Sequence, residues 1–360
     1  MSSVDTPEGA PGFRKRKRAG WKRYVFAGVG AAIVIGTFAI ALPKIADYRD
    51  VWDVVSTLSW QWIAILVGAT ILNLATFAPP WMVTLPGLSF RQAMAMTQAS
   101  TALSIVAPGG AAIGMAGSFG MLRAWGFKVR DVTRAVTITG VWNQLANLVF
   151  PVVALFMLKA DGGETALLGT AAFVGVVVLG VVLAILALVF YSDALARDVG
   201  DAVAQAVSFV LRRIRRRPVT WGGVDFARFR GEAVDLLARR WHVLTLATFG
   251  GSLTVFLLLV LSLRAVGVTG GEVDVIEIFA AWSLIRIIGA IPITPGGFGI
   301  VELGLTSALV AFGGSNAEVV AGVLIYRFLT VVPTLALGGL AALTFRSHAR
   351  RGREEIAMER

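Results

Sequence analysis

Residues 165–190 read TALLGTAAFVGVVVLGVVLAILALVF, a run that contains no charged side chain. At about 1.5 Å per residue, a helix of this length rises more than the roughly 30 Å of a bilayer's hydrocarbon core. The run is too long for a strand of a membrane barrel, and a helix satisfies its own backbone hydrogen bonds in lipid. The stretch therefore predicts a transmembrane helix and favours an all-α membrane protein.

The whole chain shares this bias. Of its 360 residues, 56% are hydrophobic and 15% are charged, and the mean hydropathy is +0.76. Soluble domains carry about 25% charged residues, so the composition predicts a polytopic integral membrane protein. The chain has no cysteine and two histidines, which excludes disulfide frameworks and thiolate catalysis and leaves too few ligands for an ordinary zinc site. We expect neither a metal nor a cofactor.

The apolar runs predict about six full spans, at 24–42, 60–80, 135–158, 165–190, 242–264 and 319–345. Two further apolar segments are each interrupted by the tripeptide Pro-Gly-Gly. Segment 91–122 is interrupted at Pro108, Gly109 and Gly110, and segment 275–312 at Pro295, Gly296 and Gly297. Each segment is either two crossings or a re-entrant hairpin with the tripeptide at its tip.

Basic residues are concentrated in 1–23, 191–241 and 345–360, which hold two-thirds of the Lys and Arg in a chain of net charge +11. Cytoplasmic segments carry such an excess, so we place both termini in the cytoplasm of a cell-membrane protein and expect no nucleic acid partner. The tails are then 1–23 and 346–360, flanking a transmembrane domain at 24–345. The amphipathic basic insert 191–241 either lies on the inner leaflet against anionic phospholipid or packs on the cytoplasmic ends of the spans.

The halves 60–158 and 242–345 resemble each other. In each, a tryptophan opens a span, a Pro-Gly-Gly break follows, and a span with an internal proline, Pro151 or Pro333, closes the unit. The charge pattern gives the two units opposite orientations, as in the inverted-topology repeats of transporters, where interrupted helices meet at a substrate site near the bilayer midplane. The alternative is that the two breaks only allow tight helix packing.

Three charged residues interrupt the apolar runs around the second break: Arg286, Glu302 and Arg327. An unpaired arginine is expensive in hydrocarbon, so each should face a cavity or a partner, and we expect an Arg286–Glu302 or an Arg327–Glu302 pair. Glu302 lies in the first turn of a helix that begins near Gly299. There it either caps a free N–H or serves as a proton or cation site. The remaining free amides at this helix end would suit an anionic headgroup.

A polar stripe lies in the span 135–158. Thr139, Asn143 and Asn147 recur every four residues and so share one helix face, with Gln144 beside them. Such groups either bond between helices or line a cavity. Asn143 and Gln144 are included among the candidate substrate contacts.

The segment 292–302, PITPGGFGIVE, with Tyr326-Arg327 downstream, is similar to the P-x-x-PGG-x-G-x-x-E pattern of the lysylphosphatidylglycerol synthase transmembrane-region family. The order of spans from about 20 to 345 also resembles this flippase-like family. The first half lacks the Gly-Glu common in the family, and Asn143-Gln144 replaces a frequent Glu-Arg. No stretch is long enough for the soluble aminoacyl-transferase domain of the synthases. The resemblance therefore implies lipid translocation without aminoacylation.

Together these observations predict a flippase-like transporter that moves or binds an amphipathic membrane lipid, with an anionic headgroup expected. No nucleotide motif is present, so movement would be downhill or ion-coupled. A single carboxylate and no histidine in the motif argue against an enzyme. The alternative is a non-catalytic subunit that docks a lipid or cell-envelope biosynthetic enzyme through 191–241. The expected partners are membrane lipids, together with either such an enzyme or further copies of the chain in a homo-oligomer. The candidate site comprises Pro108, Gly109, Gly110, Asn143, Gln144, Arg286, Pro295, Gly296, Gly297, Glu302 and Arg327.

Overall fold

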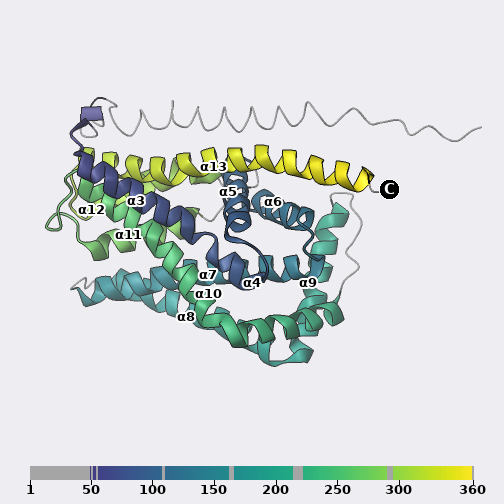
Figure 1. Ribbon diagram of the computed structural model, residues 1–360. Helices are drawn as coiled ribbons and strands as arrows, with labels where there is room; N and C mark the ends of the chain where they lie inside the picture. The colour runs from purple at the N-terminus through teal and green to yellow at the C-terminus, as the bar shows by residue number, and fades with distance from the viewer. Residues whose placement is uncertain are drawn as a thin grey trace, which may run out of the picture.

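The computed structural model describes residues 49, 52–53, 56–107, 110–161, 166–213, 222–289 and 295–358. All regular structure in these ranges is helical, so the predicted all-α membrane class is confirmed. Figure 1 shows the long helices α13 and α7 on either side of the shorter α5 and α6. The elements in chain order are α3 (Trp60–Thr76), α4 (Pro79–Thr84), α5 (Phe90–Val106), α6 (Gly110–Ala124), α7 (Val129–Ala160), α8 (Ala166–Tyr191), α9 (Asp193–Arg213), α10 (Gly223–Ala265), α11 (Val275–Gly289), the 3-10 turn η3 (Pro295–Gly297), α12 (Ile300–Ala311) and α13 (Asn316–Met358).

Five stretches in the described ranges are long and apolar enough to cross a membrane: Trp60–Thr84, Val129–Ala160, Gly169–Leu188, Arg228–Ala265 and Asn316–Thr344. They correspond to five of the six expected spans, and the sixth, 24–42, lies outside the described residues.

The span from Trp60 was expected to end at Pro79 and Pro80, and this expectation is wrong. The two prolines instead form the first turn of α4 and continue the span. Proline is tolerated at this position because the N–H it lacks has no partner within the helix there.

The two interrupted segments fold as hairpins of short helices. The four helices α5, α6, α11 and α12 have 17, 15, 15 and 12 residues, so each rises less than the roughly 30 Å of the hydrocarbon core. Within each hairpin the two helices pack on one another, α5 on α6 and α11 on α12. These lengths favour re-entrant hairpins over full crossings. Pro108, Gly109 and residues 290–294 lie outside the described residues.

Two predicted boundaries fall inside continuous helices. Helix α10 has 43 residues and passes through the boundary between the insert and the second repeat at 241/242. Neither Gly nor Pro occurs between Arg228 and Gly250 except at position 231, so nothing breaks the helix at that boundary. Helix α13 likewise continues past position 345 to Met358. The amphipathic α9 packs against α10, which favours the packed arrangement of the basic insert.

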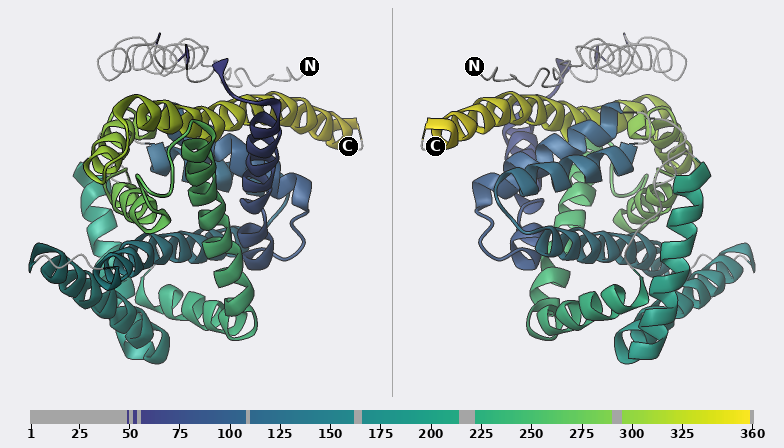
Figure 2. Two further views of the ribbon diagram at one scale, coloured as in Figure 1. Left: turned by 90° about the vertical axis from the view of Figure 1, so that its left-hand side faces the viewer. Right: turned by 90° about the vertical axis from the view of Figure 1, so that its right-hand side faces the viewer.

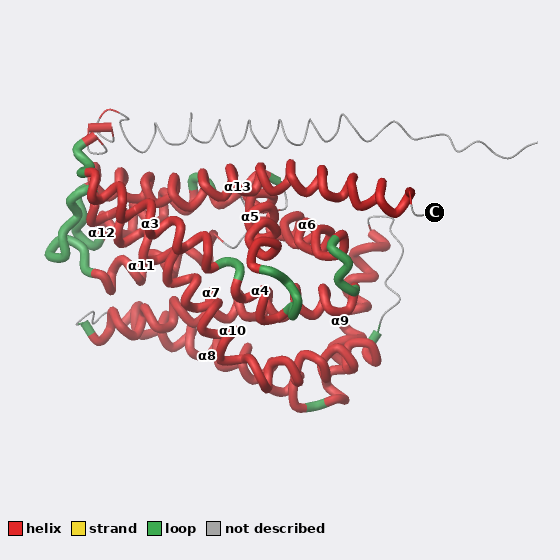
Figure 3. Tube along the Cα trace, in the orientation of Figure 1, coloured by secondary structure: helices red, strands yellow, loops and turns green. Residues whose placement is uncertain are grey.

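Figure 3 shows the loops from α10 to α11 and from α12 to α13 at the left end of that view, whereas α9 and the C-terminal end of α13 lie at the right. The acidic residues Glu272 and Asp274 belong to the loop from α10 to α11, and α9 belongs to the basic insert. The side of the membrane on which each end lies stays a prediction.

An aromatic cluster holds the second hairpin against the spans. The Trp282 ring of α11 lies 5.4 Å from the Phe150 ring of α7 and 5.4 Å from the Phe256 ring of α10. Trp282 is 1% exposed, and aromatic pairs at such distances add stability beyond their buried area. At the periphery α8 packs mainly on α7 and α9, and both views of Figure 2 show it at one corner of the bundle.

Candidate functional site

The break in the second hairpin is built from glycines in the left-handed region. Gly296, Gly297 and Gly299 have φ of 61°, 68° and 83°, a conformation that costs other residues roughly 1–2 kcal/mol each. A Cβ on Gly296 would lie 3.1 Å from Ile105 Cγ2 of α5. Gly296 at the tip of the second hairpin therefore lies against the end of α5, and its neighbour Ile105 is three residues before Pro108 of the first break.

Glu302 and Arg327 form the expected ion pair, and the Arg286–Glu302 alternative is not realised. Arg327 Nε donates to Glu302 Oε1 at 2.6 Å, and Arg327 Nη2 donates to the Gly296 carbonyl at 2.9 Å. The second oxygen of Glu302 accepts from the Gly299 N–H at 2.7 Å, as the capping prediction requires. The carboxylate is 2% exposed. The pair therefore fastens α13, the glycine turn and the start of α12 to one another.

Because Glu302 already occupies the Gly299 amide, the start of α12 is a less open anion site than the sequence predicted. Arg327 is also satisfied, since its guanidinium lies 4.9 Å from the centre of the Phe298 ring in addition to its two hydrogen bonds. Neither group is left to bind a ligand's charge without breaking a contact.

Arg286 is placed differently. Its Nε and Nη2 donate to Asn147 Oδ1 of α7 at 3.2 Å and 2.8 Å, and its guanidinium lies 4.7 Å from the centre of the Trp282 ring. Both partners are uncharged. Among the described residues no carboxylate lies within ion-pair distance of Arg286. The second hairpin thus holds a positive charge that the protein positions without neutralising it.

A cavity of about 300 Å³ opens beside this arginine. Its wall combines the glycine turn at Gly296, the guanidinium groups of Arg286 and Arg327, and the side chains of Asn147 and Tyr326. Apolar residues from α11 and α12 complete it. Such a mixture of apolar wall and a few convergent polar groups is typical of a ligand site.

A second cavity of about 120 Å³ also has Arg286 in its lining. It is lined by the α3–α4 junction, by Thr139 and Asn143 of α7, and by Thr248 and Ser252 of α10, and it shares Arg286 with the first cavity. The Thr248 hydroxyl is buried without a hydrogen-bond partner in the described structure. Cavity lining, one of the two roles left open for the polar stripe of α7, is therefore what Thr139 and Asn143 show.

Gln144 lines neither cavity. Its Oε1 accepts from Asn147 Nδ2 at 3.2 Å, so it supports the asparagine that holds Arg286. Asn147 itself was noted only as a member of the polar stripe, and Trp282 was not singled out. Trp282 and Arg286 are four residues apart on one helix, a spacing that could have indicated the contact between them.

In the first hairpin only Gly110 of the Pro-Gly-Gly sequence lies within the described residues. Its φ is 23°, and a Cβ there would lie 2.9 Å from the Ser104 carbonyl oxygen. A Cβ on Gly114 would overlap Ser104 Oγ and lie 2.5 Å from the Ser100 carbonyl oxygen. The two helices of this hairpin are thus in close contact through glycine and serine, and no ion pair joins them in the described part.

The arrangement, two short hairpins with glycine breaks and a Glu–Arg pair across the second, sits within one helical domain. The sequence model described as "Lysylphosphatidylglycerol synthase TM region" matches residues 27–338. The chain belongs to this family. Membership of the lysylphosphatidylglycerol synthase transmembrane-region family confirms the resemblance drawn from 292–302 and Tyr326-Arg327, and makes the protein a multi-pass membrane protein of a family related to lipid handling. A comparison with curated proteins finds no match.

Proposed function

We propose that this protein binds a membrane lipid by an anionic headgroup and moves it between the two leaflets of the cell membrane, without chemical change to the lipid. The single observation that carries the proposal is Arg286. It is a guanidinium in a membrane protein that faces two cavities, and its protein partners are an amide oxygen and an aromatic ring. Arg286 is half-buried, a charge without a counter-charge is expensive in an apolar environment, and an anionic headgroup would supply that counter-charge.

The two cavities give the headgroup a route. Because both include Arg286, an anion bound in one can pass to the other while it stays in contact with the same guanidinium. The first cavity borders the glycine turn of the second hairpin, and the second borders the α3–α4 junction, where the helix is interrupted at Phe77 and Ala78. Both borders are irregular backbone, which membrane proteins place where it lines a cavity rather than where it meets lipid.

The experiment replaces Arg286 by Gln and measures lipid scrambling in reconstituted vesicles. We expect Arg286→Gln to fold, since the change removes a charge that has no ion partner, and to scramble phosphatidylglycerol about tenfold or more slowly, as for the loss of a charged hydrogen bond to the headgroup. Arg286→Lys keeps the charge but not the planar fork and should fall between the two proteins.

Arg91→Gln provides the matched control because Arg91 is an exposed arginine at the start of α5 and lines neither cavity. Scrambling of phosphatidylglycerol by Arg286→Gln at the rates of the wild type and of Arg91→Gln would contradict the proposal. Stable co-purification of a biosynthetic enzyme with an inactive scramblase would support the alternative role as a docking subunit.

A further inference from the structure

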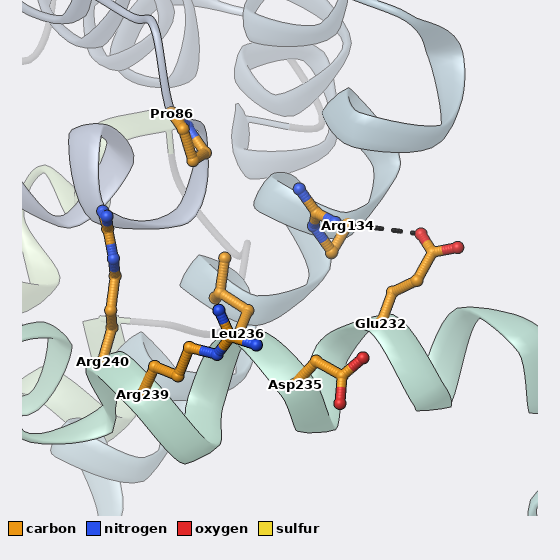
Figure 4. Close-up of a pocket in the computed structure, with 7 residues that line it drawn as sticks. All are labelled: Pro86, Arg134, Glu232, Asp235, Leu236, Arg239 and Arg240. Atoms are coloured by element: carbon orange, nitrogen blue, oxygen red, sulfur yellow. Dashed lines mark ion pairs between the residues drawn. The ribbon is translucent and has the colours of Figure 1, made fainter.

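A third cavity lies between α10, α7 and the α4–α5 loop and shares no lining residue with the two cavities at Arg286. It has a volume of about 320 Å³ and is lined by α10 residues, by Arg134 of α7 and by Pro86 of the α4–α5 loop. Figure 4 shows Arg240 at one end of this cavity and Asp235 and Glu232 at the other, with Leu236 between them. The charges of opposite sign are therefore separated along one face of one helix.

Not all of these charges are available to a ligand. Glu232 pairs with Arg130 and, at 3.8 Å, with Arg134, and Arg134 pairs in turn with Asp131 at 3.5 Å. These ion pairs form a chain of two acids and two arginines with no net charge, and two of its members, Arg134 and Glu232, line the cavity.

Asp235, Arg239 and Arg240 are the charges that remain. All three are exposed and line the cavity, and within the described structure none has an ion pair or a side-chain hydrogen bond. Asp235 and Arg239 are four residues apart and so lie one helical turn from each other, on the same face. Along the cavity, Figure 4 shows Arg240 at one end, the end of the Arg239 side chain beside Leu236 in the middle, and the carboxylate of Asp235 beyond it.

The position of the cavity indicates where its ligand comes from. Arg239 and Arg240 are the last charged residues of α10 before a run of 23 residues without charge that ends at Arg264. The run opens with Trp241, which is 56% exposed, and exposed tryptophans gather at the level of lipid headgroups. The cavity therefore opens at the headgroup level of one leaflet.

We infer that this cavity binds the headgroup of a zwitterionic phospholipid that carries a primary ammonium group, of the phosphatidylethanolamine class. The phosphodiester lies against the guanidinium groups of Arg239 and Arg240, and the ammonium donates to the carboxylate of Asp235. Arginine forks suit phosphate oxygens, and an ammonium with three N–H donors can bond a carboxylate directly. A purely anionic headgroup would leave Asp235 facing the phosphate.

The test is native mass spectrometry of the full chain with equal amounts of phosphatidylethanolamine, phosphatidylcholine and phosphatidylglycerol. We expect the protein to retain phosphatidylethanolamine over phosphatidylcholine, whose quaternary ammonium has no N–H to donate. Asp235→Asn should shift retention from phosphatidylethanolamine toward phosphatidylglycerol. The double variant Arg239→Gln/Arg240→Gln should weaken phosphatidylethanolamine binding about tenfold, as for the loss of charged hydrogen bonds.

The double variant Arg212→Gln/Arg228→Gln is the matched control, because it removes the same charge at exposed residues of α9 and α10 outside the cavity. Its lipid retention should equal that of the wild type. The shift caused by Asp235→Asn should also persist in Arg286→Gln, which separates this site from the transport cavity.

Two results would overturn the inference. Equal retention of phosphatidylethanolamine and phosphatidylcholine by the wild type, a comparison that depends on no variant's folding, would mean that no ammonium donor is recognised. Binding of the soluble headgroup glycerophosphoethanolamine as tightly as the lipid would mean that the natural ligand is a soluble molecule and not a membrane lipid.

Discussion

The two hairpins are built to the same plan but are held by different forces. The second is fastened by ionic contacts, since Arg327 reaches both Glu302 and the Gly296 carbonyl across the break. The first is held by close approach of the helices, where Gly110 and Gly114 meet the carbonyls of Ser100 and Ser104 and the Ser104 hydroxyl. Contacts of the first kind are directional and depend on charge, whereas contacts of the second kind depend on volume.

In the described residues of the first hairpin, the glycine–serine contacts leave little space between α5 and α6 and involve no charged side chain. The ionic clasp of the second hairpin satisfies its own charges and leaves Arg286 one turn from the end of α11, facing both cavities. Different substitutions should therefore break the two hairpins.

The largest effect is expected when the clasp is cut on one side. Glu302→Leu leaves Arg327 buried with no counter-charge, and breaking a buried pair in this way destabilises proteins by about 3–5 kcal/mol. We expect a clear fall in the thermal unfolding midpoint of Glu302→Leu in detergent, together with loss of lipid scrambling.

Glu302→Gln sharpens the same comparison, because the one amide oxygen can still accept from either Arg327 or the Gly299 N–H, whereas the amide NH2 cannot accept the other. It should fold with a smaller loss of stability but impair lipid movement if the charge of Glu302 takes part in coupling. Wild-type scrambling by Glu302→Gln would reduce the carboxylate to a structural cap.

A smaller effect is expected from crowding the first hairpin. Gly114→Ala places a methyl group within 2.5 Å of the Ser100 carbonyl oxygen, and overpacking of this kind destabilises by about 1–3 kcal/mol. Gly120→Ala on the same helix is the control, since a Cβ there meets nothing within 4 Å. Equal unfolding midpoints for the two variants would show that α5 and α6 are not in close contact.

The smallest effect on stability, but the most direct on topology, comes from single cysteines in a chain that has none of its own. Gly270→Cys and Ser315→Cys should react with an impermeant maleimide on intact cells, and Lys128→Cys and Gly222→Cys should not. All four positions lie in loops or at helix ends. The opposite reactivity at any one of these positions would contradict the side of the membrane that we assign to the segment around it.

Much of this architecture could be predicted because hydropathy decides which segments enter the membrane. The run at 165–190 became α8, and the breaks at the two Pro-Gly-Gly sequences separated short helices. What hydropathy could not predict was continuity. The prolines after Thr76 begin a helix instead of ending a span, and α10 crosses from polar to apolar sequence without a break.

The site was predictable where charge was scarce. With one acid available near the second break, Glu302 had two possible arginine partners, and the structure selected Arg327. The sequence could not show that Arg286 would instead take Asn147, 139 positions away, because that choice depends on how α11 packs across α7. The cavity at Arg239 and Arg240 was equally hidden, since its opposite wall comes from α7 and the α4–α5 loop.

Helix α8 stands at a corner of the bundle, and only 6% of its most apolar stretch is buried. Most of its side chains are exposed or half-exposed on the outside of the bundle, where a bilayer would offer them lipid tails, which distinguish poorly between Val, Leu, Ile and Phe. Selection on this helix acts on the average hydrophobicity of about twenty positions and hardly on any one of them. Across descendants of this chain α8 should drift fastest in sequence while its length and apolar character stay fixed, and the helices around Arg286 should drift slowest.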